Sequence, residues 1–142
     1  MQIYKLVEIN DIVLEAFERL IPQLSANSSK PTRKDLEDII KLKNTILFIA
    51  IEKTVIQGML TLIFNKIPSG DKVWIEDVVV DSNVRGAGIG KQLVQFAISY
   101  VNHKKISAIN LTSSPERLVA NKLYQELGFE KRETNVYRLK IK

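Results

Sequence analysis

This chain is organised around the segment Val78-Val79-Val80-Asp81-Ser82-Asn83-Val84-Arg85-Gly86-Ala87-Gly88-Ile89-Gly90-Lys91. Its β-branched start favours a strand, its glycines favour a tight turn, and the apolar positions that follow favour an amphipathic helix. A strand that turns directly into a helix points backbone N–H groups and the positive end of the helix dipole at whatever lies beyond the strand. The segment therefore predicts an anion site, with a phosphate-bearing ligand as its first candidate.

Two familiar phosphate-binding loops do not match the glycine spacing. The Walker loop has four residues between its first glycine and the Gly-Lys pair, whereas Gly86 and Gly90 are separated by three. The dinucleotide fingerprint G-x-G-x-x-G needs a glycine where Lys91 stands. The pattern that remains is Arg85-x-x-Gly88-x-Gly90. For this loop alone, an ordinary glycine-rich turn between a strand and a helix is the alternative.

A second segment, residues 113–129, carries a helix pattern with its own start and stop signals. Ser114-Pro115 suits a helix start, with the serine as cap and the proline in the first position. Gly128 supplies the left-handed residue that ends many helices. Asn121 and Tyr124 are three residues apart, so they share one face of this helix.

Together and in this order, the two segments resemble the hallmarks of the Gcn5-related N-acetyltransferase (GNAT) superfamily, whose ligand is acetyl-coenzyme A. The resemblance covers roughly residues 45–140. It implies a three-layer α/β fold, with a mixed central sheet of about six to seven strands flanked by about four helices. It also implies a single acetyltransferase domain over residues 1–142.

The resemblance implies that the loop binds the diphosphate of the coenzyme, because glycines let the backbone approach closely. It further implies an irregular strand end, where the N–H groups of Val79 and Val80 face the thioester carbonyl and the pantetheine; one such donor is worth about 3 kcal/mol. Asn121 contacts the pantetheine or steadies the site, and a solvated helix asparagine is the alternative. The full set of expected coenzyme contacts is Val78, Val79, Val80, Arg85, Gly86, Ala87, Gly88, Ile89, Gly90, Lys91 and Asn121.

Acetyl transfer to an amine also needs a base, because a primary amine loses its proton at pH 7 at a cost of roughly 4.6 kcal/mol. Glu76 and Asp77 lie in the middle of a predicted strand, where acidic residues are poorly placed. Alternation is expected to send them to opposite faces, so that only one serves the site. Glu76 is favoured as the base, directly or through water, with an exposed or substrate-binding role as the alternative.

The resemblance places Tyr124 at the general-acid position of the family. A phenol has a pKa of about 10 and a thiol one of about 8.5, so complete proton transfer to the thiolate is uphill by roughly 2 kcal/mol. Tyr124 is therefore expected to act as a hydrogen-bond donor, or with its pKa lowered. A helix tyrosine that simply packs in the core is the alternative.

Composition sets limits on the other functions. The chain has 142 residues, no Cys and one His, so disulfides, a cysteine nucleophile and a multi-histidine metal centre are excluded, and no metal is expected. The net charge of +5 suits anionic partners, but Lys and Arg are dispersed and no basic-aromatic interleaving indicates nucleic acid. The longest apolar run, Ile46–Ile51, is too short to span a membrane. We expect a cytoplasmic protein, without a membrane or nucleic-acid partner, as a monomer or homodimer.

The hydrophobic periodicity predicts the elements in order. Strands are expected at 3–9, 45–52, 55–65, 73–81, 106–112 and as two short strands within 129–141; helices are expected at 11–20, from Thr32 to Leu42, at 88–102 and at 115–127.

The sequence does not decide whether the acceptor amine belongs to an amino sugar, an amino acid, a polyamine or a peptide. The string Ile75–Val80 followed by Arg85-Gly86 is similar to glucosamine-6-phosphate N-acetyltransferases, in which the acidic pair helps to hold the amino sugar, whereas residues 113–137 are closer to generic small-amine acetyltransferases. Ser82 and Val84 stand where many members carry Pro and an aromatic, which leaves the backbone donors in place. The alternatives from other classes are a noncatalytic acyl-coenzyme A sensor and a basic nucleic-acid-binding domain.

Overall fold

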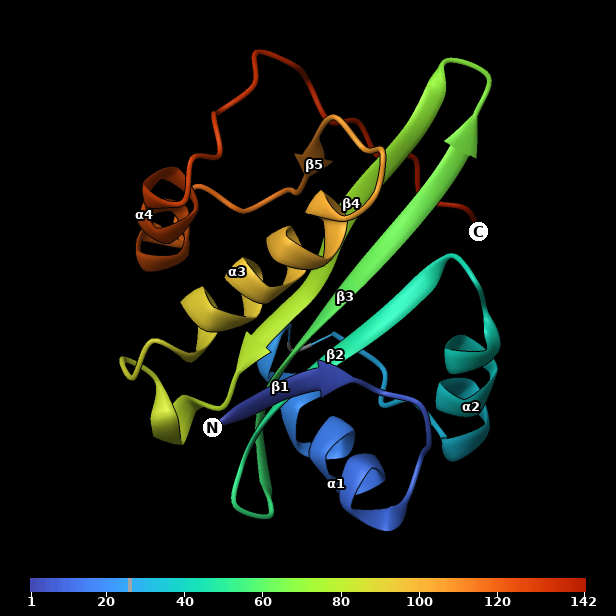
Figure 1. Cartoon of the computed structure of the whole chain (residues 1–142), viewed down its shortest axis with the longest axis vertical. Helices are drawn as coiled ribbons and strands as arrows, with labels where there is room; N and C mark the ends of the chain where they lie inside the picture. Colours follow the sequence, from blue (N-terminus) through green and yellow to red (C-terminus); the bar gives the residue numbers. More distant parts are fainter. Residues whose placement is uncertain (26) are drawn as a thin grey trace. The chain divides into compact units, whose positions relative to one another are not determined.

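The computed structural model describes residues 1–25 and 27–142. It divides into two compact units, residues 1–112 and residues 113–142. Within the described residues, the first unit holds a five-stranded sheet with α1 to α3, and the second unit holds α4 (Figure 1). A single acetyltransferase domain over residues 1–142 stays a prediction.

The order of helices and strands along the chain is typical of an α/β protein with a mixed sheet. They are β1 (Gln2–Lys5), α1 (Asp11–Leu20), the 3₁₀ turn η1 (Ile21–Gln23), α2 (Arg33–Lys41), β2 (Thr45–Glu52), β3 (Val55–Ile67), β4 (Gly70–Val80), the 3₁₀ turn η2 (Ser82–Val84), α3 (Ile89–Asn102), β5 (Ile109–Asn110) and α4 (Leu118–Glu126).

The sheet is mixed, as predicted. Its strand order is β1-β2-β3-β4-β5; β1 to β4 pair antiparallel, and β5 pairs parallel to β4 (Figure 1). Two tight hairpins connect the long strands, at Lys53-Thr54 and at Pro68-Ser69. The prediction of six to seven strands is too high, because the described residues form five.

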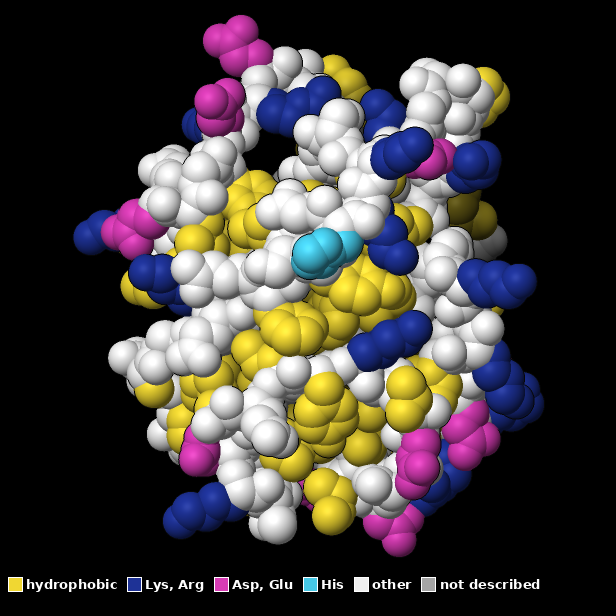
Figure 2. Space-filling view, in the orientation of Figure 1, with side chains coloured by type: hydrophobic (Ala, Val, Ile, Leu, Met, Phe, Trp, Pro, Cys, Tyr) yellow, Lys and Arg dark blue, Asp and Glu magenta, His cyan; other side chains and the backbone are white. Residues whose placement is uncertain are grey.

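Charged side chains of both signs are interspersed on the face of the molecule drawn in Figure 2. Basic side chains do not gather there into one continuous patch or stripe.

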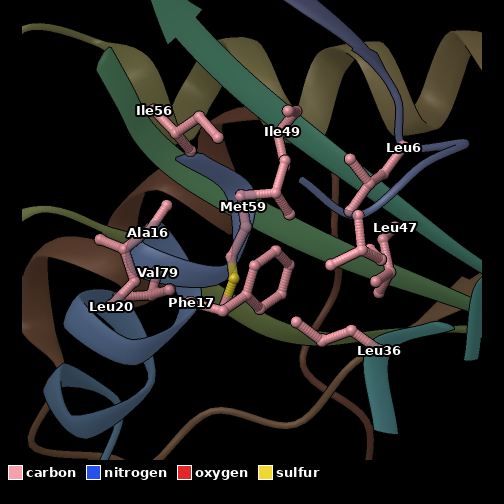
Figure 3. Packing of buried hydrophobic residues seen from close by; sticks show 12 residues of the cluster. Leu6, Ala16, Phe17, Leu20, Leu36, Leu47, Ile49, Ile56, Met59 and Val79 are labelled. Atoms are coloured by element: carbon pink, nitrogen blue, oxygen red, sulfur yellow. The ribbon is translucent and has the colours of Figure 1, made fainter. Parts of the chain in front are cut away.

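The helices of the first unit cover both faces of the sheet. Helices α1 and α2 cover one face, where Phe17 and Leu20 of α1 and Leu36 of α2 join strand residues in one buried cluster. Figure 3 shows the Met59 sulfur lying against the Phe17 ring in this cluster. On the other face, α3 packs through edge-on aromatic contacts of Phe48 with Phe96 and Tyr100. The three expected layers are therefore present within residues 1–112.

Local signals account for the helix starts. Asn10 accepts a hydrogen bond from the Val13 N–H at the start of α1, and Thr32 forms a capping box with Asp35 at the start of α2, as predicted for Thr32. In α4, by contrast, the predicted start at Ser114-Pro115 is wrong. Those residues form a preceding turn, in which the Arg117 N–H donates to the Ser114 carbonyl, and the helix begins at Leu118.

Several predicted strands are shorter or absent. The strand at 3–9 is limited to Gln2–Lys5, and the strand at 106–112 to Ile109–Asn110. Residues 129–141 form no strand, so the prediction of two short strands there is wrong. A strand needs a neighbour to accept its ladder hydrogen bonds, and β5 pairs only with Val73 and Trp74 of β4. A favourable sequence pattern alone does not supply that neighbour.

Gly58 of β3 lets α3 approach the sheet closely. A Cβ atom at this position would lie 3.1 Å from the Leu93 Cδ1 atom, 3.1 Å from the Val79 carbonyl oxygen and 3.4 Å from the Ile89 Cγ2 atom. Ile89 and Leu93 belong to the first turns of α3, directly after the glycine-rich loop. The position of this helix start therefore depends on the missing side chain of Gly58.

We predict that Gly58→Val lowers the free energy of unfolding by about 1–3 kcal/mol, because the added atoms meet a backbone oxygen and a packed helix. Urea denaturation of both proteins measures the difference. Gln57→Val, at the neighbouring position of the same strand, is the control and is expected to change stability little. An unchanged midpoint for Gly58→Val would contradict the close packing of α3.

Candidate functional site

The loop between β4 and α3 is held open by two left-handed glycines. Gly86 has φ +88° and Gly88 has φ +80°, a region that other residues rarely adopt. Gly88 is the N-cap of α3. Because glycine has no side chain, no side-chain oxygen at this position accepts a hydrogen bond from the N–H groups of the first turn. The sequence prediction of a glycine-dependent turn is confirmed at these two positions.

The backbone N–H groups of this loop are without hydrogen-bond partners among the described residues. In the part of the chain that the structure describes, the N–H groups of residues 86–91 donate no hydrogen bond, and the first bond of α3 runs from Gln92 N–H to the Gly88 carbonyl. A Cβ atom built on Gly86 or Gly88 meets nothing within 4 Å. Free donors, the helix dipole and empty space together suit an anion that lies against the backbone.

The charged side chains of the loop have different roles. The Arg85 Nε–H donates to the Val80 carbonyl at 3.2 Å, so this side chain folds back onto the end of β4. Lys91 lies exposed in the first turn of α3. Ala87 is also exposed, whereas Ile89 is buried and anchors the helix start in the core. The coenzyme contact expected of Ile89 is therefore limited to its backbone.

The last residues of β4 have one free edge. Strand β5 pairs with β4 only at Val73 and Trp74, so beyond these residues β4 is bordered by β3 alone. The Asp81 N–H donates to the Gln57 carbonyl on β3, and alternation then directs the peptide groups of Val79 toward β3 and those of Val80 toward the free edge. Of the two valines chosen as N–H donors, the geometry favours Val80. Val78 lies within the irregular part of the strand.

That irregularity is a β-bulge at Asp77. Met59 pairs with Val79 and Thr61 with Glu76, so two residues of β4, Asp77 and Val78, face one residue of β3. Asp77 itself has φ +50°, a strained value for a residue with a side chain. The placement of Glu76 and Asp77 on opposite faces stays a prediction, since the bulge begins between them, and the charge of Asp77 acts on the pKa of Glu76.

The two acidic side chains have raised pKa values. Partial burial raises the pKa of Glu76, and the neighbouring negative charge of Asp77 raises it further. Burial also raises the pKa of Asp77. Both residues are exposed enough to reach solvent, so proton exchange with water stays possible. A carboxylate with a raised pKa is a stronger base than an ordinary one.

The second unit holds the other two predicted site residues on α4. Tyr124 is 8% exposed and packs edge-on against Phe129 at 5.9 Å between ring centroids. Burial raises its pKa, and the charge of Arg117 opposes this shift only in part. The Asn121 Nδ2 group donates to the Ser114 carbonyl at 2.9 Å, so this side chain holds the turn before α4. Gly128 ends the helix with φ +98°, as predicted.

One polar residue beside the loop was given no role by the sequence patterns. Asp81, the residue that follows β4, is 7% exposed and forms an ion pair with Arg19 of α1. These residues are 62 positions apart, so no local pattern connects them. The available signal was a charged residue directly after a buried strand.

Neither a metal centre nor a membrane helix is found in the described residues. No three His, Cys, Asp or Glu side chains there gather in a way that would hold a metal ion. None of the described helices is both long and apolar enough to cross a bilayer.

The whole arrangement matches a known family. The model of the acetyltransferase (GNAT) family matches residues 7–129. The chain belongs to this family. The match includes β4, the glycine loop, α3 and α4, and GNAT proteins use acetyl-CoA.

Individual relatives agree with the family assignment. N-acetylaspartate synthetase of Xenopus tropicalis is 28% identical over 102 residues, which are 69% of this GNAT chain and 37% of that protein. The chain thus spans little more than a third of the length of this curated relative.

Two solved structures are similar over nearly the whole chain. An aminoglycoside N-acetyltransferase in complex with CoA has a TM-score of 0.79 at 26% identity, covering 98% of this chain and 93% of that chain. Glucosamine-6-phosphate N-acetyltransferase from Arabidopsis thaliana has a TM-score of 0.78 at 24% identity, covering 97% of each chain, and this likeness shows the fold alone.

We predict that Asp77→Asn lowers the pKa of Glu76, because the substitution removes the neighbouring negative charge while the burial of Glu76 remains. Asparagine tolerates the positive φ of this position, so the bulge is expected to stay. Carboxyl ¹³C shifts recorded against pH measure the change. Asp71→Asn, at the far end of the same strand, is the control; an equal effect of both variants would show that the pKa of Glu76 is not raised by the charge of Asp77 in particular.

Proposed function

We propose that this GNAT protein is an acetyl-CoA-dependent N-acetyltransferase that acetylates a primary amine of a small molecule or peptide. The observation that carries the proposal is the loop at residues 86–91, whose N–H groups donate no hydrogen bond within the described residues and whose Gly86 and Gly88 adjoin empty space at the start of α3. Such a loop suits a diphosphate, and the free edge of β4 continues from it. The fold of a GNAT acetyltransferase is consistent with the proposal.

In this proposal the backbone does most of the binding. The N–H groups of residues 86–91 hold the diphosphate, while the Lys91 side chain adds positive charge nearby. The Val80 N–H, on the free edge of β4, donates to the pantetheine or to the thioester carbonyl. Donors fixed in this way stabilise the negative charge that develops on the carbonyl oxygen as the amine attacks.

Glu76 acts as the base in the proposal, directly or through a water molecule. The pKa of Glu76 is raised and so lies closer to the pKa of an ammonium group than the pKa of an ordinary carboxyl group does. This smaller difference reduces the cost of proton transfer from the amine to Glu76. Asp77 contributes a second negative charge at the same bulge. The pair also provides an attractive site for the positive charge that the acceptor carries before it is deprotonated.

Tyr124 donates a hydrogen bond to the leaving thiolate. Its raised pKa makes complete proton transfer to sulfur more uphill than for a free phenol, so the donor role is preferred over that of a full acid. Asn121 steadies α4 and its preceding turn through the Ser114 carbonyl, which favours the supporting role over a direct coenzyme contact.

The acceptor class is proposed to be a cationic amine, of the amino sugar, amino acid, polyamine or peptide type. We further propose one domain over residues 1–142, acting in the cytoplasm as a monomer or homodimer without a nucleic-acid or membrane partner. The interspersed charges on the face drawn in Figure 2 support this choice over a nucleic-acid-binding domain.

A panel of amines, amino sugars and peptides tests the function directly. Thiol release from acetyl-CoA is measured with each, and amine-dependent release is expected for at least one class. Tight CoA binding without release for any amine would instead favour a noncatalytic sensor, and a failure to bind CoA would overturn the proposal.

We predict that Gly90→Ala weakens CoA binding at least tenfold without lowering the melting temperature. Gly90 is the second residue of α3, where alanine favours the helix, while its methyl group occupies space assigned to the diphosphate. Calorimetry and thermal unfolding measure the two quantities. Ser99→Ala, at an exposed position of the same helix, controls for helix propensity and is expected to keep the wild-type affinity.

We predict that Tyr124→Phe lowers kcat about 100-fold, because the ring packing is kept and only the donor is lost. Steady-state kinetics with the best acceptor from the panel measure the effect, and CoA affinity is expected to change little. A turnover equal to that of the wild type would remove Tyr124 from the mechanism and leave it a core residue.

A further inference from the structure

A polar network joins α1 to the residue at which the chain leaves the sheet. The Arg19 Nη1 group pairs with the Asp81 carboxylate, and its Nη2 group donates to the Ile56 carbonyl of β3 at 2.9 Å. The Gln23 side chain, in η1, accepts from the Ser82 N–H at 2.9 Å and donates to the Arg19 carbonyl at 3.2 Å. Two neighbouring residues of the chain after β4, Asp81 and Ser82, are therefore held by α1 and by the 3₁₀ turn η1 that follows it.

The backbone N–H, the backbone carbonyl and the carboxylate of Asp81 all form hydrogen bonds, and together they fix the direction in which the chain enters the loop. Its N–H donates to the Gln57 carbonyl at 2.8 Å, and its carbonyl accepts from the Val84 N–H at 3.0 Å, which closes η2. The carboxylate accepts from the Asn83 N–H at 3.1 Å as well as from Arg19. The Asn83 N–H and then Arg19 hold the pKa of Asp81 below its ordinary value despite burial, so the carboxylate stays charged at neutral pH.

In the loop that follows, Arg85 is held by the Val80 carbonyl, whereas the described N–H groups of residues 86–91 make no hydrogen bond. Gly86 and Gly88 adopt left-handed conformations, and glycine exchanges readily between such conformations and others. The loop is thus held from its two ends, by the start of α3 on one side and by Asp81 and Ser82 on the other. A loop that loses one of these anchors samples more conformations, and a ligand must then order it at the expense of affinity.

We infer that Arg19 and Gln23 are positioning residues for the diphosphate-binding loop: by fixing Asp81 and Ser82 they keep the loop N–H groups arranged for the ligand. The inference rests on the proposed function, because it concerns the same loop. Neither residue is placed on the ligand itself. They are expected to influence the affinity for the coenzyme and not the chemical step.

The chain offers a matched control for this network. Arg33 of α2 also joins a carbonyl and a carboxylate, since it donates to the Ile9 carbonyl at 2.8 Å and pairs with Asp11. This ion pair fixes the start of α1 and has no contact with the loop residues. Removing either arginine is expected to loosen one attachment of α1, but only Arg19→Met removes an anchor of the loop.

The test measures CoA affinity by calorimetry for wild type, Arg19→Met, Gln23→Ala and Arg33→Met. We expect Arg19→Met to weaken CoA binding about tenfold and Gln23→Ala about threefold, with wild-type affinity for Arg33→Met. Arg19→Lys, which keeps the charge but not the two-fold contact, is expected to restore only part of the loss. If Arg19→Met does not fold, Gln23→Ala and Asp81→Asn take its place, because each leaves the rest of the network.

Kinetics separate positioning from a general structural effect. Arg19→Met is expected to raise the KM for acetyl-CoA and keep kcat at saturation. Turnover with S-acetylpantetheine, which lacks the diphosphate, is expected to equal that of the wild type. Losses of the same size with both donors, or in Arg33→Met, would overturn the inference, as would wild-type affinity in both Arg19→Met and Gln23→Ala. Failure of the wild type itself to bind CoA would overturn the proposed function first and the inference with it.

Discussion

The candidate site depends on the pairing of β4, which has a neighbouring strand on both sides along only part of its length. At Val73 and Trp74 the strand is paired on both sides, whereas from Ile75 onward only β3 remains beside it. The bulge at Asp77 then changes the register, and the ladder is regained only for the last residues before the loop. Peptide groups that would otherwise be used within the sheet are left at the free edge of β4. A ligand that lies along this edge would add the missing hydrogen bonds.

Burial shifts the pKa of the proposed site residues in the same direction in each of the two units. Burial raises the pKa of Glu76, of Asp77 and of Tyr124. For the carboxylates this shift improves their action as bases, and for the phenol it opposes full ionisation. The same physical effect thus supports a proton-accepting role for Glu76 and a hydrogen-bonding role for Tyr124. Asp77 strengthens the first of these because its charge acts on Glu76.

The parts of the fold that the sequence predicted correctly are those determined by neighbouring residues. The Thr32 cap, the Lys53-Thr54 hairpin and the left-handed Gly128 each follow from the preferences of a few adjacent positions. The glycine loop belongs to the same class, since its turn and its open N–H groups follow from local spacing. The strands expected within 129–141 failed because strand formation needs a partner elsewhere in the chain.

The candidate site shows the same division. The loop could be placed from sequence, but the bulge at Asp77 could not, because a register shift is a property of two strands. Alternation could reveal neither the positive φ of Asp77 nor the effect of its charge on the pKa of Glu76. The pairing of Arg19 with Asp81 was equally hidden, since it depends on how α1 packs on the sheet.

Through this packing, α1 contacts both the sheet face that carries Glu76 and the residue at which the loop begins. Its apolar side shares a buried cluster with Met59 and Val79, on the sheet face to which the pairing of Thr61 with Glu76 also assigns Glu76. Its last turn carries Arg19, which reaches the residue that opens the loop. A shift of α1 would therefore move the surroundings of Glu76, the proposed base, together with the ion pair that holds Asp81.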